Sequence, residues 1–526
     1  MSAILTTRHK YTLIDNFIDT LSSSSANVYM GIGRVVQWSA GDIVIPVPTE
    51  STDDTNSVFR TLIALKKITA ASVSPVIRRR DWTYGTVYDA FDNTVDMFST
   101  LSITSTGKTV NALSSRTVTG NAISSSFSAG DLIRLPGDGG DIASQTKEVV
   151  SITNADAILV NTAFSANYTS NVALKVSDTF PNFSKKFYVR NEKDQVFKCL
   201  FNSGNATSKI MPEISIGGQL PQSVYIETSD GYKWKYLYTI DSSSKRKFFT
   251  PDWMPVAKNQ FVSDAAVDGS IDIIKIVSGG NNYNFGVATS NAAILTVSGD
   301  GTGASLSARV SSNGAIYGIN ILNGGSGYTK ANVSASGGDG TASFIPVIGP
   351  KYGHGKNPIV ELGASHLAIS VDLDKDESGT IPTQGIAEVF DYHQISIIKD
   401  PITTSGTYAS DSNYRMTYAI STSPSPNFAL DETVYQGSSL ATATFTASVV
   451  YWDSTNSVIY VNNISGTFSE SQAIRGTIQT TAVTAYTLTS PSIQKYTGEI
   501  LYINNSAGIN RDPNQAEQLK LTLSFK

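Results

Sequence analysis

The residues in this sequence that could do chemistry are few and scattered. Four histidines, which are His9, His354, His366 and His393, have no spacing that predicts a metal site or a catalytic pair. The sequence contains no nucleophile elbow, no His-Glu-x-x-His motif and no Walker-type phosphate loop. We therefore predict a protein that is not an enzyme and that holds no metal and no cofactor.

Two acidic segments resemble cation sites but favour another interpretation. Carboxylates alternate at Asp372, Asp374 and Asp376, as in a calcium loop, yet Glu377 stands where such a loop needs glycine. We interpret this segment as a solvated turn. Asp300 and Asp339 lie in Gly-Asp-Gly turns, and calcium binding there is the alternative to a turn role.

The densest basic cluster, Arg78 to Arg80, is followed directly by an acid and a tryptophan, Asp81 and Trp82. Arginine forms bidentate ion pairs and stacks on rings, so this cluster indicates a protein interface or an internal ion-pair network. A second segment predicts a strand with Tyr232, Trp234, Tyr236 and Tyr238 on one face, which is typical of a core and alternatively of a sugar-binding groove. Our candidate interface residues are Arg78, Arg79, Arg80, Asp81, Trp82, Tyr232 and Trp234.

Composition limits the class of protein. The 526 residues include 39 basic and 44 acidic side chains, a net charge of −5, and only 16% are charged. This balance indicates no nucleic-acid surface, and no apolar run approaches the roughly 18 residues that predict a membrane helix. The lone cysteine, Cys199, excludes an intrachain disulfide and is predicted to be a small core residue. The abundant Ser, Thr, Asn and Gly are typical of a turn-rich β protein.

Few segments show helical periodicity. Apolar residues repeat at helical spacing over 11–21 and over about 55–70, so we predict a helix in each. Short β-branched runs separated by turn residues predict small β modules elsewhere. The clearest hairpin pairs 448–452 with 457–461 through the turn at 453–456.

An internal repeat is the strongest sign of organisation. Residues 276–283 recur at 321–328, and Gly299–Thr302 recurs as Gly338–Thr341. Each copy predicts a strand, a glycine turn, a tyrosine and a second glycine turn. Two copies are too few for a free solenoid, so we expect this unit to pack on another part of the chain.

These signals predict a mainly β, multidomain protein. It would have a discontinuous β-rich body with a few short helices and three inserted small all-β modules, since insertions are best tolerated at exposed loops. The predicted body comprises 1–93, 179–270, 350–404 and 491–526. The predicted insertions are 94–178, 271–349, which is the glycine and tyrosine repeat, and 405–490.

The body blocks carry a family resemblance. Val76–Trp82, Asp230–Leu237, Tyr392–Pro401, Gly498–Asn505 and Gln515–Phe525 occur in this order. Together they resemble a dimer-forming baseplate wedge subunit of T-even-like contractile-tailed bacteriophages. The resemblance covers about half of the chain and does not extend to the three insertions.

The resemblance implies a structural virion protein of the phage tail baseplate. Such a protein is assembled in the host cytoplasm, forms a homodimer and docks neighbouring wedge proteins during tail assembly. Its expected partners are thus itself and other wedge proteins, with no nucleic acid and no membrane. The alternative is a tail receptor-binding or carbohydrate-binding module, and a polysaccharide-degrading enzyme would need a converging carboxylate pair that nothing in the sequence selects.

Overall fold

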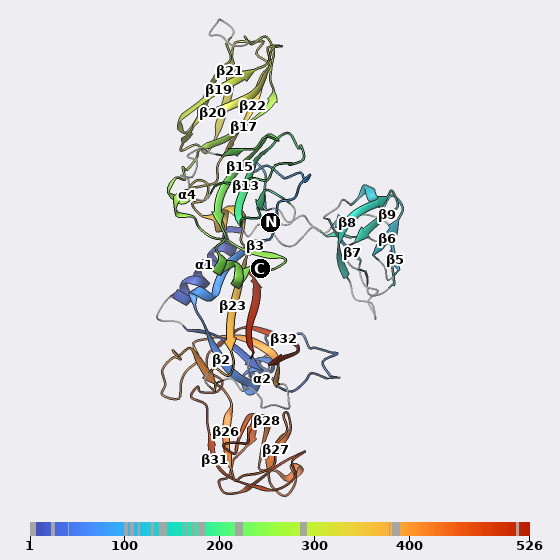
Figure 1. Ribbon diagram of the computed structural model, residues 1–526, viewed down its shortest axis with the longest axis vertical. Helices are drawn as coiled ribbons and strands as arrows, with labels where there is room; N and C mark the ends of the chain where they lie inside the picture. The colour runs from blue at the N-terminus through green and yellow to red at the C-terminus, as the bar shows by residue number, and fades with distance from the viewer. Residues whose placement is uncertain are drawn as a thin grey trace. The chain divides into compact units, whose positions relative to one another are not determined.

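The computed structural model of the chain describes residues 7–22, 27–39, 41–98, 104–105, 110–113, 116–127, 131–135, 145–160, 163–164, 167–170, 174–176, 185–215, 225–284, 292–377, 379–380, 390–511 and 515–525. Over these residues it has 33 strands and five α-helices (Figure 1), which confirms the predicted mainly β, multidomain fold with a few short helices. The helices are α1 (Thr7–Ser22), α2 (Thr52–Thr61), α3 (Ser242–Phe248), α4 (Gln260–Asp264) and α5 (Pro358–Leu362). Three short 3-10 turns are η1 (Ala70–Ser72), η2 (Ile123–Ser125) and η3 (Leu440–Thr442).

The chain divides into two compact units. Unit 1 comprises Met1–Tyr11, Pro75–His366 and Ser524–Lys526, and unit 2 comprises Thr12–Ser74 and Leu367–Leu523. The predicted body therefore falls in both units, because its first and third blocks each contribute to unit 1 and to unit 2. The seven-part division of the sequence stays a prediction.

Unit 2 is built around a five-stranded antiparallel sheet. The strand order is β25 (Asn413–Arg415), β2 (Leu62–Ile68), β1 (Val28–Gly33), β24 (Phe390–Lys399) and β32 (Glu499–Arg511). The central strand β1 is buried along its whole length and pairs with β2 on one side and β24 on the other. Strand β23 (His366–Asp374) lies beside β33 (Ala516–Ser524), and all their residues except His366 and Ser524 belong to unit 2.

The helix predicted over 55–70 is half wrong. Ser51 caps α2 by accepting a hydrogen bond from the Asp54 backbone N–H, and the helix ends at Thr61. The following run from Leu62 is strand β2, whose first four residues are buried between β1 and β25. A short apolar run fits a buried strand as well as a helix, so sheet pairing decided its structure. The other prediction, a helix over 11–21, is confirmed by α1, in which Tyr11 and Ile14 are the buried residues.

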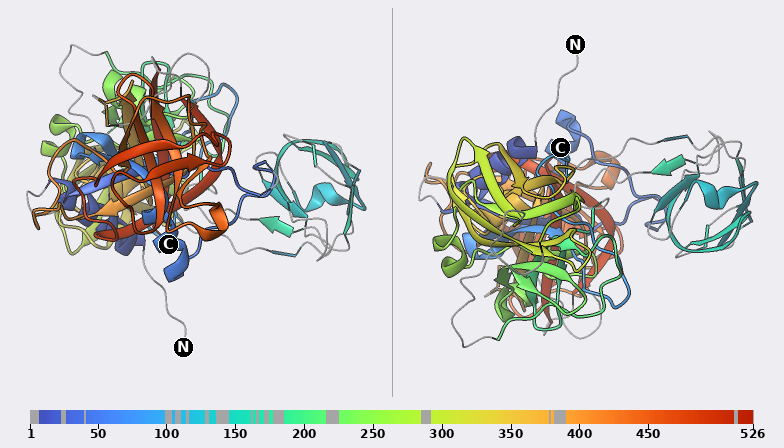
Figure 2. Two further views of the ribbon diagram at one scale, coloured as in Figure 1. Left: turned by 90° about the horizontal axis from the view of Figure 1, so that it is seen from below. Right: turned by 90° about the horizontal axis from the view of Figure 1, so that it is seen from above.

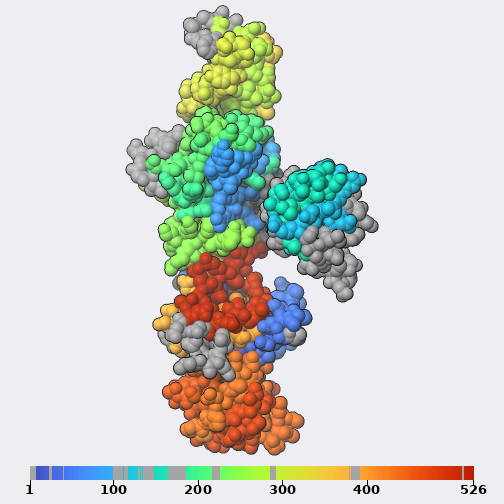
Figure 3. All heavy atoms as spheres, turned by 45° about the vertical axis from the view of Figure 1, so that its right-hand side comes forward, coloured from blue at the N-terminus to red at the C-terminus, as the bar shows by residue number. Residues whose placement is uncertain are grey.

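A closed six-stranded barrel occupies most of the segment predicted as the third insertion. Its strand order is β26 (Tyr418–Thr422), β29 (Val458–Gly466), β28 (Phe445–Asp453), β27 (Thr433–Gln436), β30 (Ala473–Gly476) and β31 (Val483–Thr489). The predicted hairpin is confirmed, since β28 and β29 pair around the turn that follows Asp453. Alternate residues such as Val449, Ile459 and Ile474 fill the interior. The barrel atoms, orange to red-orange in Figure 3, form one contiguous packed body.

One boundary of that insertion differs from the prediction. Strand β25 lies within 405–490, yet it pairs with β2 and extends the sheet of unit 2. Tyr414 packs edge-on against Tyr29, with 5.8 Å between the ring centroids. The buried aromatic contact draws this segment onto the sheet, so the barrel begins only at Tyr418.

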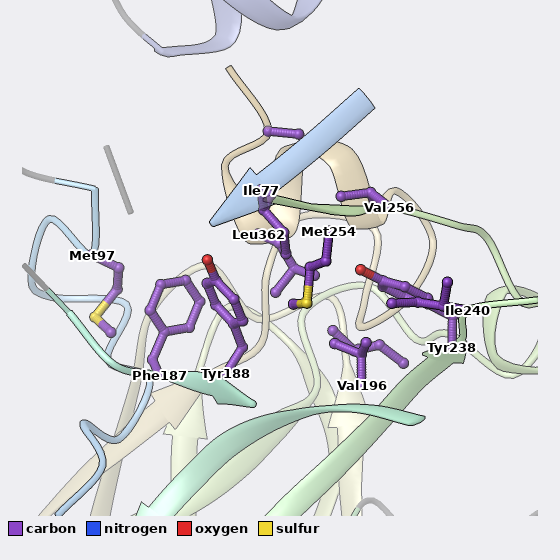
Figure 4. Packing of buried hydrophobic residues seen from close by; sticks show 12 residues of the cluster. Ile77, Met97, Phe187, Tyr188, Val196, Tyr238, Ile240, Met254, Val256 and Leu362 are labelled. Carbon is purple, nitrogen blue, oxygen red and sulfur yellow. The ribbon is translucent and has the colours of Figure 1, made fainter. Parts of the chain in front are cut away.

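Unit 1 contains a four-stranded antiparallel sheet, whose order is β12 (Tyr188–Arg190), β13 (Gln195–Asn202), β15 (Tyr232–Thr239) and β14 (Ile226–Glu227). Next to it, β3 (Val73–Arg78) pairs with β16 (Trp253–Pro255) from Val76 onward. Buried side chains of both groups form one core, in which Met254 lies between the rings of Tyr188 and Tyr238 (Figure 4). This core fixes the end of β3, from which the arginine cluster extends.

The segment predicted as the first insertion forms an eight-stranded sheet, and parts of 94–178 lie outside the described residues. Its order is β10 (Asn167–Ser170), β5 (Val110–Leu113), β6 (Thr117–Gly120), β9 (Ala157–Val160), β8 (Gln145–Asn154), β7 (Leu132–Leu135), β11 (Leu174–Val176) and β4 (Thr104–Ser105). The sheet curls round a core of its own, cyan to teal in Figure 2. Met97 instead packs in the core of the neighbouring sheet, so the predicted boundary at residue 94 is a few residues early.

The repeat folds as a duplicated module of six strands in three antiparallel pairs. The first copy supplies β17 (Ile271–Ser278), β18 (Ile294–Gly299) and β19 (Thr302–Val310), and the second supplies β20 (Ile316–Ser326), β21 (Ala331–Ser336) and β22 (Ser343–Ile348). The pairs are β17 with β22, β18 with β21 and β19 with β20. Every pair thus joins a strand of one copy to a strand of the other.

Hydrogen bonds join the turns of the two copies to each other. Asp300 of the first copy accepts hydrogen bonds from the backbone N–H groups of Thr329 and Lys330, which directly follow the second tyrosine. Asp339 of the second copy accepts one from the backbone N–H of Asn281, just before the first tyrosine. This hydrogen bond and those from the backbone N–H and hydroxyl of Thr341 lower the pKa of Asp339 to about 2. The predicted turn role of both acids explains their contacts without a cation.

Candidate functional site

The arginine cluster follows strand β3 and is held by a second strand. The backbone N–H of Trp82 donates to the carbonyl of Arg190 at 2.8 Å, and the N–H of Arg190 donates to the carbonyl of Arg80 at 2.7 Å. Asp81 and Arg190 therefore face each other in a short parallel bridge. Main-chain pairing brings together residues that are more than 100 positions apart in the sequence.

Asp81 is the centre of an ion-pair network. Its carboxylate accepts from Arg79 at 2.6 Å and from Arg190 at 2.7 Å. Arg190 also pairs with Asp194, which in turn binds Lys245 of α3 at 2.8 Å. Burial alone would raise the pKa of Asp81, but the two arginines outweigh burial and lower it. The carboxylate is therefore ionised whenever the fold is intact near neutral pH.

Aromatic rings complete the network. The guanidinium groups of Arg79 and Arg190 lie 4.6 and 4.7 Å from the ring centroid of Phe249, within the range of cation–π attraction. Arg78 pairs with Asp252 at 3.2 Å and lies 5.1 Å from the ring centroid of Trp253.

Arg80 and Trp82 also contact residues of unit 1. The Arg80 guanidinium lies 5.6 Å from the ring centroid of Tyr188, and the Trp82 indole N–H donates to the Ser208 hydroxyl at 3.0 Å. All five cluster residues, Arg78 to Trp82, thus have partners within unit 1. Of the two interpretations of the cluster, its geometry is that of an internal network, with half-exposed edges.

Tyr232 and Trp234 are core residues, which corrects their place among the candidate interface residues. Both side chains are 0% exposed, so neither can touch a partner in this fold. Their rings stack with centroids 5.3 Å apart, and Tyr88 packs edge-on against both. The prediction that this aromatic strand is core is confirmed for both residues, and their burial excludes the alternative, a sugar-binding groove at their side chains.

The aromatic stripe is also shorter than predicted. Tyr232, Trp234 and Tyr236 share one core, but a β-bulge opposite Val196 and Phe197 shifts the alternation of β15. Tyr238 consequently joins Leu237 in the core on the other face. Strict alternation fails wherever a bulge inserts one extra residue.

Cys199 lies in this sheet with its thiol buried, as predicted. Burial raises the pKa of the thiol well above its ordinary value, and the charge of Asp89 adds to the effect. The thiol is therefore not a nucleophile in the folded chain. In the described part of the chain, no group of three or more His, Cys, Asp or Glu side chains is placed to hold a metal ion.

An exposed apolar segment in unit 2 was not predicted from the sequence. Ile43, Val44 and Val47 are 83%, 58% and 84% exposed, and Ile45 lies between them at 37%. The Asn505 side-chain amide donates to the carbonyl of Pro46 at 2.9 Å and ties the segment to β32. The sequence does carry a sign of this segment, because four large aliphatic residues fall within five positions. Such a run usually indicates a buried strand, so the sequence gives no reason to expect an exposed surface there.

The chain matches no protein-family model and no curated protein sequence. Within the described residues, no helix is both long and apolar enough to cross a bilayer.

Proposed function

We propose that this chain is a non-catalytic structural subunit of a contractile phage tail baseplate, of the wedge class. It forms a homodimer and docks neighbouring wedge proteins. The proposal is supported by the segments that resemble wedge subunits. They occur in the same order along the chain as in that family, and they lie in both compact units. It is supported also by the architecture, in which β modules with cores of their own offer many separate surfaces.

The observation that carries the assembly role is the exposed apolar segment from Ile43 to Val47. A soluble protein rarely exposes several large aliphatic side chains together unless they bind a partner. The segment is held in place, because Trp38 donates to the Ser506 carbonyl at 2.9 Å and Gly508 donates to Asp42 at 3.1 Å. A surface that is ordered before binding loses less conformational entropy when a partner docks.

The occupant that we propose for this surface is a second copy of the chain. The only charged side chain among residues 41–49 is Asp42, and its carboxylate already accepts from the Trp38 and Gly508 backbone N–H groups. Two such surfaces can meet across a twofold axis without opposing like charges. Burying the four aliphatic side chains would contribute roughly 1.5–3 kcal/mol each at most, before the costs of association.

Size-exclusion chromatography with light scattering tests the dimer. We expect a dimer of the wild-type chain at micromolar concentration, and a monomer when Ile43→Asp and Val47→Asp are combined. Val277→Asp is the matched control, because Val277 is 63% exposed in the duplicated module of unit 1. A wild-type monomer, or a dimer that survives the double substitution, contradicts this part of the proposal.

The baseplate role needs a separate test. Contractile-tailed particles from the source of the sequence would be purified and their proteins identified by mass spectrometry. We expect the chain in six or twelve copies per particle, as the sixfold symmetry of the resembling family implies. Its absence from particles that contain the other tail proteins contradicts the proposal, and a map of the particle would locate its partners.

A carbohydrate-binding role is the second candidate, and one observation favours it. Tyr317 and Leu322 are 63% and 68% exposed on β20. An exposed aromatic ring can stack on the face of a sugar. A glycan array probed with the full chain and with Tyr317→Ala tests this role. Binding that the substitution abolishes supports it, and no binding by the wild-type chain refutes it.

A further inference from the structure

A buried histidine in unit 1 lies between two carboxylates. The Nε2 atom of His354 is 2.5 Å from Oδ2 of Asp272, and its Nδ1 atom is 2.5 Å from Oε1 of Glu361. All three side chains are buried. A carboxylate only accepts hydrogen bonds, and an imidazole donates from both nitrogens only when it is protonated. The geometry therefore calls for a charged imidazolium.

Two lysines act on the same two carboxylates. Lys198 of β13 is fully buried and binds Oε1 of Glu361 at 2.9 Å, while its Nζ lies 3.5 Å from the ring centroid of Phe91. Oε2 of Glu361 accepts from the backbone N–H of Gly355 at 2.7 Å. Lys235 of β15 is the second lysine, and burial lowers its pKa while Asp272 and Glu361 offset part of the effect.

The pKa values follow from these contacts. Burial alone would lower the pKa of His354, but Asp272 and Glu361 outweigh burial and raise it above the ordinary value of 6.5. For Glu361, burial is outweighed by the charges of Lys198 and His354, which lower its pKa far below the ordinary range. Burial lowers the pKa of Lys198, and Glu361 restores part of the loss.

These charges lie where the duplicated module meets the sheet of unit 1. Asp272 belongs to β17 of the module, Lys198 belongs to β13, and Glu361 belongs to α5. Ile273 of the module packs with Leu200 of β13 in the same place. The histidine thus joins an inserted module to the sheet on which it packs.

We propose that His354 is a proton-dependent latch that fastens the duplicated module to unit 1. The latch is closed while the imidazolium donates to both Asp272 and Glu361. When His354 loses a proton, a single N–H remains for two buried carboxylates, and one of them is left without its partner. An unpartnered buried carboxylate is costly, so the attachment of the module weakens. This inference does not rest on the proposed assembly role.

The sign and size of the effect follow from linkage. The folded pKa of His354 is above its unfolded value, so its contribution is complete below about pH 6.5 and is lost as the pH rises through the folded pKa. Within that interval the module loses up to about tenfold in protection from opening for each pH unit, because one proton is released. The lowered pKa of Glu361 acts at the acid end, so the latch stays closed in mild acid. Lys198 and Lys235, whose pKa values are lowered, give slopes of the opposite sign.

Nuclear magnetic resonance of the imidazole nitrogens gives the direct test. In the full chain we expect more than half of the His354 rings to be doubly protonated at pH 6.5, and the ring to become neutral at a higher pH than an exposed histidine. Asp272→Asn keeps the size of the side chain and should lower the titration midpoint of His354. A His354 ring that becomes neutral at the same pH as an exposed histidine, or at a lower pH, overturns the latch.

Hydrogen exchange measures the consequence for the module. Exchange of peptides from β17 and β22 would be followed from about pH 6 to about pH 9, with peptides from β8 and β9 of the eight-stranded sheet, which has a core of its own, as the internal reference for the intrinsic rate. We expect protection to fall with pH in the wild-type chain and to be lower but nearly pH-independent in Asp272→Asn. The matched control is Asp92→Asn, which removes the Asp92 to Lys275 ion pair between the module and the rest of unit 1. It should lower protection equally at every pH, and a wild-type profile that does not depend on pH overturns the proposal.

Discussion

Substituting Gly301 by alanine tests whether the two copies of the repeat stabilise each other as one folding unit. Gly301 lies in the turn between β18 and β19 of the first copy. An added Cβ would lie 2.4 Å from Cγ of Tyr328, in the second copy, and 2.6 Å from the carbonyl oxygen of Ser326. Neither atom is the free end of a flexible chain, so the backbone or the buried ring must move.

The expected cost is that of overpacking a filled core. Inserting one carbon into such a site costs about 1–3 kcal/mol. The upper half of this range applies here, because Tyr328 is buried and the carbonyl belongs to a paired strand. About 2 kcal/mol corresponds to roughly 30-fold faster exchange of the module's protected amides, or to a melting temperature lower by about 8–16 °C for a module of this size.

Hydrogen exchange of the full chain is the appropriate assay, because it reports on each module separately. Peptides from both copies should lose protection together, since every strand pair joins one copy to the other. Ser305→Ala is the control on the exposed face of β19 and should change stability by less than about 0.5 kcal/mol. The reasoning is refuted if Gly301→Ala leaves exchange unchanged, or if only the first copy becomes less protected.

Three further predictions concern other parts of the chain. Burial and the charge of Asp391 raise the pKa of Asp431 to about 7, so its contribution to stability is lost as the pH rises from about 4 through 7. Asp431→Asn should therefore raise the melting temperature at pH 8 and not at pH 4, and equal effects at both would contradict this. Cys199 should react with a thiol reagent only in denaturant, since its thiol is buried, whereas rapid labelling of the native chain would argue against the fold. Asp81→Asn should destabilise unit 1 by about 1 kcal/mol in denaturant unfolding, as expected of a half-exposed ion-pair network. An unchanged free energy of unfolding would show that the ion pairs of Asp81 do not stabilise the fold.

The candidate site was predictable only in part. A cluster of arginines beside an acid and a tryptophan correctly indicated ionic and aromatic contacts, and both interpretations of it were open. The partners Arg190, Asp194 and Phe249 are distant in the sequence, and no local pattern marks them. Tyr232 and Trp234 were assigned by residue type alone, and their burial depends on how β13 and β15 pair.

The sequence by itself determined the mainly β fold, the two repeat copies, the β28 and β29 hairpin and the buried cysteine. These features depend on local composition, turn residues and short-range alternation, which the chain carries without reference to distant contacts. Only the tertiary structure decided that the run after Thr61 is a strand, that a bulge turns Tyr238 to the other face, and that the repeat copies exchange strands. It alone brought Asp272, His354 and Glu361 together. Such features depend on which distant segments pair and what they bury, and that free energy is not present in any single segment.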